Sequence, residues 1–290
     1  MLSVLIPTYN YNSFPLVEEI HNQLKKTAID FEIICLDDAS QSELNAENQK
    51  INELEFCHFS ELKINLGRSA IRNLLVSKSK FNWLLFLDGD VLPVNTTFID
   101  SYLQCIKENS FYVFTGGVKY KSDKLNETLL HYKVGFLNEE VDFKKRQKKP
   151  YKYFFSSNFL IEKSVFEGIK FEERLKEYGK EDLLFSLKLK ENEINIHHIE
   201  NQVYHLGVDE DRDFLIKTKQ AMKNLAMLKD SKIVSKKESS LLQLASFLKS
   251  FGLTNILERL VPSLEKKIGK KNSLFYFKLL KISYLCSFLK

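Results

Sequence analysis

Short apolar runs alternate with amphipathic segments along the first 90 residues. The apolar runs predict strands, and the segments between them, whose apolar residues have helical spacing, predict helices. The expected strands are Leu2–Ile6, Phe31–Leu36, Glu55–Phe59 and Trp83–Leu87, and the expected helices are Leu16–Lys25, Glu43–Asn52 and Arg68–Ser79. Continuously apolar strands separated by helices indicate a parallel sheet covered on both faces, and ligands bind such a sheet beyond the carboxyl ends of its strands.

The pattern is looser after Asp90. It predicts a strand at Phe111–Thr115, several short strands within 153–206, and helices at Phe98–Lys107, Lys124–Asn138 and Lys180–Glu191. From Asp211 onward only helical periodicity is present, over 211–229, 236–250, 253–268 and 272–289. Segment 144–152 carries six basic residues in nine, which predicts a solvated loop that either contacts a ligand or is simply mobile.

The composition is that of a folded protein, with 44% hydrophobic and 28% charged residues in 290. The four cysteines have no CxxC spacing, so we expect buried thiols in a reducing compartment, the cytoplasm, and neither zinc ligands nor disulfides. No signal peptide is expected, because the apolar run that begins the chain reads as a core strand. No apolar stretch reaches the length of about 18 residues that a membrane-spanning helix needs.

The charge is unevenly distributed. Residues 1–208 carry 26 Lys and Arg against 30 Asp and Glu, whereas residues 231–290 carry 12 against 3. A basic tail of this kind favours an anionic partner. Segment 274–290 combines Phe, Tyr and Leu with three lysines, which predicts a peripheral helix at the inner face of the cytoplasmic membrane; the alternative is a core helix with an exposed lysine edge. No nucleic acid is expected as a ligand.

Three acidic clusters follow apolar or strand-rich segments: Asp37-Asp38, Asp88-Gly89-Asp90 and Glu181-Asp182. Two carboxylates one residue apart at a strand end can share a divalent cation, and oxygen ligands suit Mg²⁺ or Mn²⁺. Asp residues also cap helices and turns, but three such clusters together favour a ligand site. The chain has neither a GxxxxGK[ST] loop nor a GxGxxG motif, which excludes the phosphate sites that those motifs form.

Four motifs together resemble family-2 glycosyltransferases. They are Val4-Leu5-Ile6-Pro7-Thr8-Tyr9-Asn10, Leu36-Asp37-Asp38-Ala39-Ser40, Asn65-Leu66-Gly67-Arg68 with Ala70, Arg72 and Asn73, and Leu87-Asp88-Gly89-Asp90. The resemblance covers residues 1–208 and implies an α/β fold of GT-A type, with a Rossmann-like mixed sheet flanked by helices. Residues 1–115 would bind the nucleotide sugar, residues 116–208 the acceptor, and residues 209–290 would form a basic helical extension.

The resemblance also implies roles for single residues. Tyr178-Gly179-Lys180-Glu181-Asp182 is similar to the family's Gly-x-Glu-Asp motif, so Asp182 would be the general base and Glu181 would orient the acceptor or the base. The donor residues would be Pro7, Thr8 and Tyr9 around the nucleoside, Asp38 on the base, Asp37 in a structural or ribose role, Arg68 and Arg72 on phosphate or ribose, and Asp88 on ribose or metal. Asp90 would hold the metal, together with His205 unless that histidine is only a structural residue.

The function that follows is metal-assisted transfer of a sugar, with inversion, from a nucleotide diphosphate donor to a hydroxyl. The expected donor is a UDP-sugar, the acceptor a glycan or lipid-linked glycan, and the cofactor Mn²⁺ or Mg²⁺. Two alternatives stay open at this point: a nucleotidyltransferase that makes activated sugars, and a non-catalytic relative that binds glycan.

Overall fold

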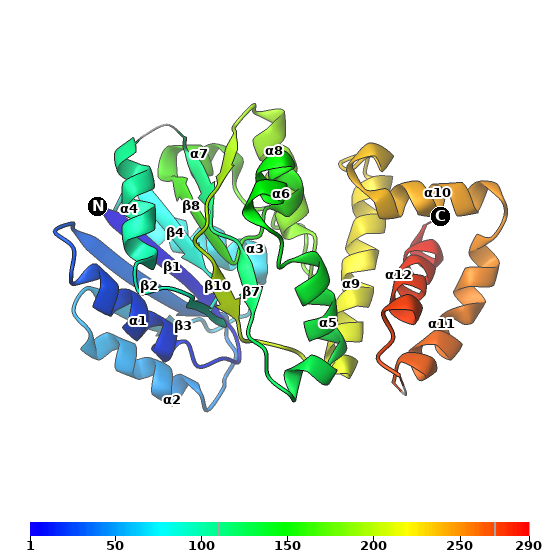
Figure 1. Cartoon of the computed structure of the whole chain (residues 1–290), viewed down its shortest axis with the longest axis horizontal. Coiled ribbons are helices and arrows are strands. Elements are labelled where there is room, and N and C mark those ends of the chain that lie inside the picture. The colour runs from blue at the N-terminus through cyan, green and yellow to red at the C-terminus, as the bar shows by residue number, and fades with distance from the viewer. Residues whose placement is uncertain (109–110, 270, 290) are drawn as a thin grey trace. The chain divides into compact units, whose positions relative to one another are not determined.

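The computed structural model describes residues 1–108, 111–269 and 271–289 (Figure 1). Two compact units share the chain. Unit 1 comprises Met1–Lys121, Phe136–Lys176 and Glu181–Gly207, and unit 2 comprises Ser122–Gly135, Glu177–Lys180 and Val208–Lys290.

Unit 1 is built on a seven-stranded mixed sheet with the order β3-β2-β1-β4-β8-β6-β9. The strands are β1 Leu2–Thr8, β2 Phe31–Asp37, β3 Cys57–Glu61, β4 Trp83–Leu87, β6 Val113–Thr115, β8 Asn158–Glu162 and β9 Ile196–His198. The first four are parallel, whereas β8 is antiparallel to both of its neighbours. The predicted α/β fold with a mixed sheet is therefore confirmed, and β3 begins two residues later than expected.

Helices cover both faces of this sheet because its strands are apolar on both sides. Leu5 and Phe86 belong to a core that also contains apolar residues of α3, α7 and α8. Alternate residues such as Val4 and Ile6 are buried on the opposite face, where α1 and α4 contact each other (Figure 1). The helices up to residue 191 are α1 Phe14–Leu24, α2 Asn45–Asn48, α3 Arg68–Lys78, α4 Phe98–Glu108, α5 Leu130–Asn138, α6 Phe143–Lys148, α7 Lys163–Ile169 and α8 Glu181–Glu191, with 3-10 turns η1 Gln49–Glu53, η2 Asn126–Thr128 and η3 Pro150–Tyr153.

A second sheet of three short strands follows directly from Asp90. Its order is β5-β10-β7, with β5 Val91–Pro93, β7 Val118–Tyr120 and β10 Val203–His205. Strand β10 is antiparallel to β5 and parallel to β7. The register pairs His205 with Val91, so a histidine far along the chain is brought beside the Asp88-Gly89-Asp90 motif.

Unit 2 contains the four helices predicted at the end of the chain. They are α9 Asp211–Asp230, α10 Ser240–Ser250, α11 Thr254–Ile268 and α12 Leu274–Phe288, with a 3-10 turn η4 Lys236–Glu238 before α10. Helix α12 contacts the other three, and Phe277, Leu280 and Leu285 are buried among them.

Of the two interpretations of segment 274–290, the structure supports the core helix, because Phe277, Leu280 and Leu285 of α12 are buried in unit 2, although Phe275 is exposed. Lys290 lies outside the described residues. No helix in the described part of the chain combines the length and the apolar character needed to span a bilayer.

Segment 144–152 is not the solvated loop that its lysines predicted. It forms most of α6 and η3, and the Arg146 side chain is buried. The Arg146 guanidinium donates to four backbone carbonyls, those of Thr115 (3.3 Å), Gly116 (3.0 Å), Val141 (3.1 Å) and Ile199 (2.8 Å). It also contacts Nδ1 of His198 at 2.9 Å. Burial lowers the pKa of His198 to about 4, and the charge of Arg146 contributes in the same direction, so the imidazole is neutral and Nδ1 accepts.

We expect Arg146→Met to lower the free energy of unfolding by about 3 kcal/mol, because four buried carbonyls lose their donor at once. Chemical denaturation measures this loss. Lys145→Met is the matched control, since Lys145 is exposed on the same helix and its replacement should change stability little. Equal stability of the two variants would contradict an anchoring role for Arg146.

Candidate active site

The Asp88-Gly89-Asp90 motif leaves β4 and turns beside the end of β1. The Gly89 amide donates to the Pro7 carbonyl at 3.2 Å. A Cβ at Gly89 would lie 2.5 Å from Ser13 Oγ and 2.8 Å from Thr8 Oγ1, so only glycine allows this close approach. The turn thereby places the two carboxylates of the motif at the carboxyl edge of the parallel strands.

Two arginines of α3 hold Asp88. Arg72 Nη2 pairs with Asp88 Oδ1, and Arg68 Nη2 lies 3.6 Å from Asp88 Oδ2. The two arginines are four residues apart and therefore share one face of the helix. The Arg72 side chain is 2% exposed and the Arg68 side chain 40%. In this structure Arg72 is buried against Asp88, whereas the Arg68 side chain is partly exposed.

The same arginine joins the strand end to the start of α8. Arg68 Nε lies 2.5 Å from Glu181 Oε1. Burial raises the pKa of Glu181, but the charges of Arg68 and Arg72 lower it by more, so the net shift is downward and Glu181 is ionised.

The pKa of Asp182, the next residue, is shifted in the opposite direction. Burial raises its pKa to about 6, the negative charge of Glu181 adds to this, and Ser156 and the two arginines lower it. Its Oδ1 is buried and has no hydrogen-bond partner among the described residues. Two adjacent carboxylates are thus held in different states, one ionised and one that titrates near neutral pH.

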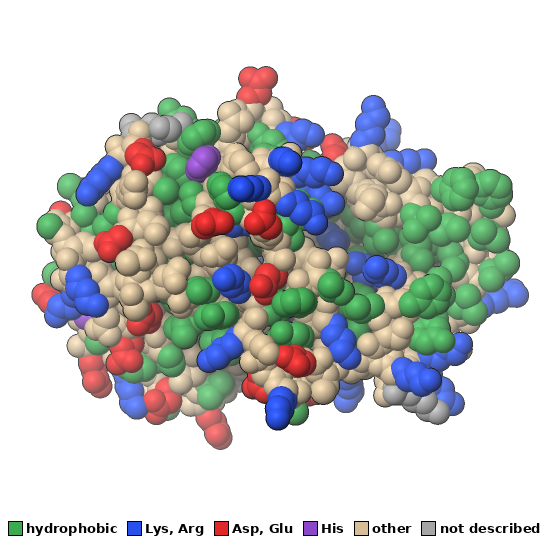
Figure 2. Space-filling model, viewed as in Figure 1, with side chains coloured by type: hydrophobic (Ala, Val, Ile, Leu, Met, Phe, Trp, Pro, Cys, Tyr) green, Lys and Arg blue, Asp and Glu red, His purple; other side chains and the backbone are tan. Residues whose placement is uncertain are grey.

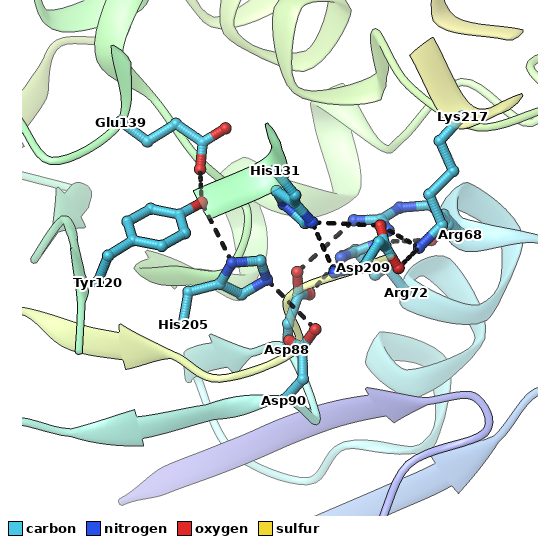
Figure 3. A network of polar contacts seen from close by, with 10 residues as sticks. All are labelled: Arg68, Arg72, Asp88, Asp90, Tyr120, His131, Glu139, His205, Asp209 and Lys217. Carbon is cyan, nitrogen blue, oxygen red and sulfur yellow. Dashed lines mark hydrogen bonds and ion pairs between the residues drawn. The ribbon is translucent and has the colours of Figure 1, made fainter. Parts of the chain in front are cut away.

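The other carboxylate of the motif, Asp90, pairs with His205 across the second sheet. Nε2 of His205 lies 3.3 Å from Asp90 Oδ2, and its Nδ1 lies 3.2 Å from the Tyr120 hydroxyl, which donates to Glu139 at 2.6 Å (Figure 3). Burial lowers the pKa of His205, but the charge and hydrogen bond of Asp90 raise it by more, to about 9. Figure 3 shows this line of side chains and the Asp88 pair with the two arginines in one view.

The side chains around the motif offer few ligands for a divalent cation. Among the described residues no three His, Cys, Asp or Glu side chains converge as metal ligands. Asp90 and His205 are in contact and offer one oxygen and one nitrogen, while Asp88 is engaged by the arginines. Such a pair fits Mn²⁺ or Mg²⁺ if the ion takes its other ligands from phosphate and water, as Mg²⁺ commonly does.

The remaining predicted donor residues lie at the ends of β1 and β2. Asp37 is fully buried and accepts from the amide (2.8 Å) and hydroxyl (2.7 Å) of Ser40, which is a turn-stabilising role. Asp38 is buried, and its two oxygens accept from the amides of Leu66 (2.7 Å) and Gly67 (2.9 Å), so it fixes the loop before α3.

Of the three residues expected around the nucleoside, two are accessible. Thr8 is buried and accepts from Ser13 Oγ at 2.8 Å, Pro7 is half-buried, and Tyr9 is exposed. Tyr9 is thus accessible to solvent at the end of β1.

Several positioning residues gave no signal in the sequence. Tyr120 and Glu139 belong to segments without a motif. Gly207 lies just after β10 and beside Asp90, and a Cβ added to Gly207 would lie 2.1 Å from Asp90 Oδ2. In unit 2, the Asn224 side chain of α9 donates to the carbonyls of Glu177 (3.0 Å), Tyr178 (3.2 Å) and Gly179 (2.8 Å). These three residues belong to the loop that precedes α8. Only the folded chain brings these residues to their partners.

Comparison with known families identifies the fold and the class of enzyme. The model of "Glycosyl transferase family 2" matches residues 3–169. The chain belongs to this family. It therefore contains a glycosyltransferase domain, as the sequence motifs predicted.

The family 2 chain is similar in sequence to longer glycosyltransferases. It is 27% identical to "Chondroitin synthase" of Escherichia coli over 142 residues, which is 48% of this chain and 20% of that protein. It is 34% identical to an uncharacterized glycosyltransferase of Rickettsia conorii over 113 residues, 38% of this chain and 18% of that protein. The match spans about a fifth of the length of these relatives.

Solved structures share the fold. A mannosyltransferase of Pyrobaculum calidifontis, solved with GDP-Man and Mn²⁺, has a TM-score of 0.62 at 12% identity and covers 98% of this chain and 84% of its own. S. aureus TarS has a TM-score of 0.51 at 19% identity, covering 98% of this chain and 50% of its own. These similarities confirm the GT-A fold of the family 2 chain.

We expect Gly207→Ala to lower turnover at least about tenfold, because the new methyl group must displace the Asp90 carboxylate, and small misplacements in an active site are costly. Turnover with a nucleotide-sugar donor and the melting temperature are measured together. Gly168→Ala is the control, since nothing lies within 4 Å of the added Cβ. Normal turnover by a folded Gly207→Ala protein would show that the position of Asp90 is not critical.

Proposed function

We propose that the protein transfers a sugar from a nucleoside diphosphate sugar to a hydroxyl group with inversion at the anomeric carbon, and that Asp182 is the general base. The observation that carries this proposal is the contrast between Glu181 and Asp182 at the start of α8. Glu181 is bound by Arg68 and its pKa is lowered, so it is a weak base. Asp182 has a pKa raised to about 6, which suits removal of a proton near neutral pH.

The donor would bind near Asp88, Asp90 and helix α3. Arg68, whose side chain is 40% exposed, would contact the diphosphate, while buried Arg72 keeps Asp88 in place. Pro7, Thr8 and Tyr9 would line the nucleoside, and Asp38 would shape that pocket through the loop that it holds. Residues 116–208 would bind the acceptor.

Asp90 and His205 would hold the divalent cation. When bound, Mn²⁺ or Mg²⁺ neutralises charge on the diphosphate leaving group. Asp90 supplies the oxygen, and its pKa is held down by His205 and Arg68 against the effect of burial. Tyr120 and Glu139 orient the imidazole from its other nitrogen.

The relatives support the substrate classes. TarS has been solved with UDP and with UDP-GlcNAc, whereas the mannosyltransferase was solved with GDP-Man, and we propose uridine as the base here. The curated relatives include chondroitin and hyaluronan synthases, which supports a glycan or lipid-linked glycan as acceptor. Four free cysteines support a cytoplasmic location.

Two other functions have less support. Membership of family 2 argues against a sugar nucleotidyltransferase. A non-catalytic glycan-binding relative would have no need for a carboxylate whose pKa is raised to about 6 beside an ion-paired one.

A donor screen tests the proposed function. We expect hydrolysis or transfer with UDP-sugars in the presence of Mn²⁺ or Mg²⁺, and little with GDP- or dTDP-sugars. Release of the nucleoside diphosphate is measured with each metal and with chelator. Pyrophosphate release from a nucleoside triphosphate and a sugar phosphate would point to the nucleotidyltransferase instead, and inactivity with every donor would favour the non-catalytic relative.

We expect Asp182→Asn to lower turnover at least about 10²-fold while nucleotide binding is kept, because only proton removal is lost. In the unsubstituted protein kcat/KM should fall as the pH drops through about 6, since protonated Asp182 cannot act as a base. The residual activity of the variant should lack this step. A pH profile of both proteins, with calorimetric titration of UDP, measures the two effects, and near-normal turnover would move the base to another residue.

A further inference from the structure

Helices α10 and α11 expose a set of large apolar side chains. The six are between 38% and 64% exposed: Leu244, Phe247, Phe251, Leu253, Ile256 and Leu260. We call this set the α10–α11 patch. Figure 2 shows hydrophobic side chains gathered over these two helices. The ring centroids of Phe247 and Phe251 are 4.8 Å apart, so these two side chains contact each other.

The patch is separate from the core of unit 2. Helix α11 buries Leu257, Leu264 and Ile268, and it packs on α12. Leu253, Ile256 and Leu260 recur with the same helical spacing but remain exposed. Helix α10 likewise buries Leu242 and Ala245 and exposes Leu244 and Phe247, and Phe251 directly follows this helix. Each helix thus has a second apolar face that folding does not use, which is typical of a binding surface.

The surroundings of the patch are basic. Residues 231–290 carry 12 Lys and Arg against 3 Asp and Glu. Lys249, Arg259, Lys266 and Lys267 are exposed on α10 and α11. Of the two glutamates on these helices, Glu265 accepts from the Tyr284 hydroxyl at 2.6 Å, and Glu258 is the exposed one. Apolar and aromatic side chains among basic ones are the composition of a surface that enters the headgroup region of an anionic bilayer.

We propose that the α10–α11 patch binds the protein to an anionic lipid surface, with Phe247 and Phe251 inserted among the headgroups. A second copy of the chain is a poorer occupant, because pairing the patch with itself would bring two strongly basic segments together. Anionic lipid supplies both an apolar phase for the side chains and the opposite charge. This binding is independent of the proposed transfer reaction.

Co-sedimentation of the full chain with vesicles tests the proposal. The vesicles are phosphatidylcholine alone or phosphatidylcholine with phosphatidylglycerol, each at low and high salt. We expect binding to the anionic vesicles, and we expect F247S together with F251S to weaken the partition coefficient at least about tenfold. High salt should reduce binding of the unsubstituted protein only in part, since the apolar contribution is not screened.

The control carries two serines at equally exposed positions outside the patch, L125S and L137S, and should bind vesicles normally. Melting curves and the donor assay show that all three proteins are folded. The proposal is overturned if the unsubstituted protein does not bind anionic vesicles or if the Phe247 and Phe251 variant binds equally well. A lipid-independent dimer that this variant disrupts, without vesicle binding, would identify the patch as an interface between copies.

Discussion

Charge pairing around two arginines holds the candidate site together. Arg72 is buried against Asp88, and Arg68 spans from the same carboxylate to Glu181, so one turn of α3 joins the end of β4 to the start of α8. Without these guanidinium groups the carboxylates of two distant segments would repel one another at the same sheet edge. The arrangement fixes Asp88 and keeps Glu181 ionised, and it leaves the neighbouring Asp182 outside the pairing.

The position of Asp182 one residue beyond the pairing explains its chemistry. Its charge is opposed by burial and by Glu181, whereas the arginines that offset these effects are committed to other carboxylates. Asp90 differs from Asp182, because it is paired with His205, whose imidazole also contacts Tyr120, and Tyr120 donates to Glu139. The same edge of the sheet therefore carries Asp90, which suits a cation, Arg68, which suits phosphate, and Asp182, whose carboxylate can accept a proton.

The sequence predicted most of the fold because the first four strands are long apolar runs and the last helices have clear periodicity. Strands β5 and β7 were missed, since three residues show no period. Motifs located Asp88, Asp90, Glu181 and Asp182, but Tyr120, Glu139 and Gly207 acquire their meaning only where separate segments meet. Helix α12 is apolar all round, which is typical of a buried helix, whereas the amphipathic α11 is the better candidate for a binding surface.

Arg146 anchors segment 144–152 from its buried side, so the stability of the segment does not depend on its exposed side chains. One guanidinium donates to four carbonyls of three neighbouring segments, and the lysines around it are exposed and take no part in that anchor. Substitutions at those lysines therefore leave the backbone of the segment where it is. The charge on this part of the surface can therefore change through single mutations while the fold of the segment stays the same.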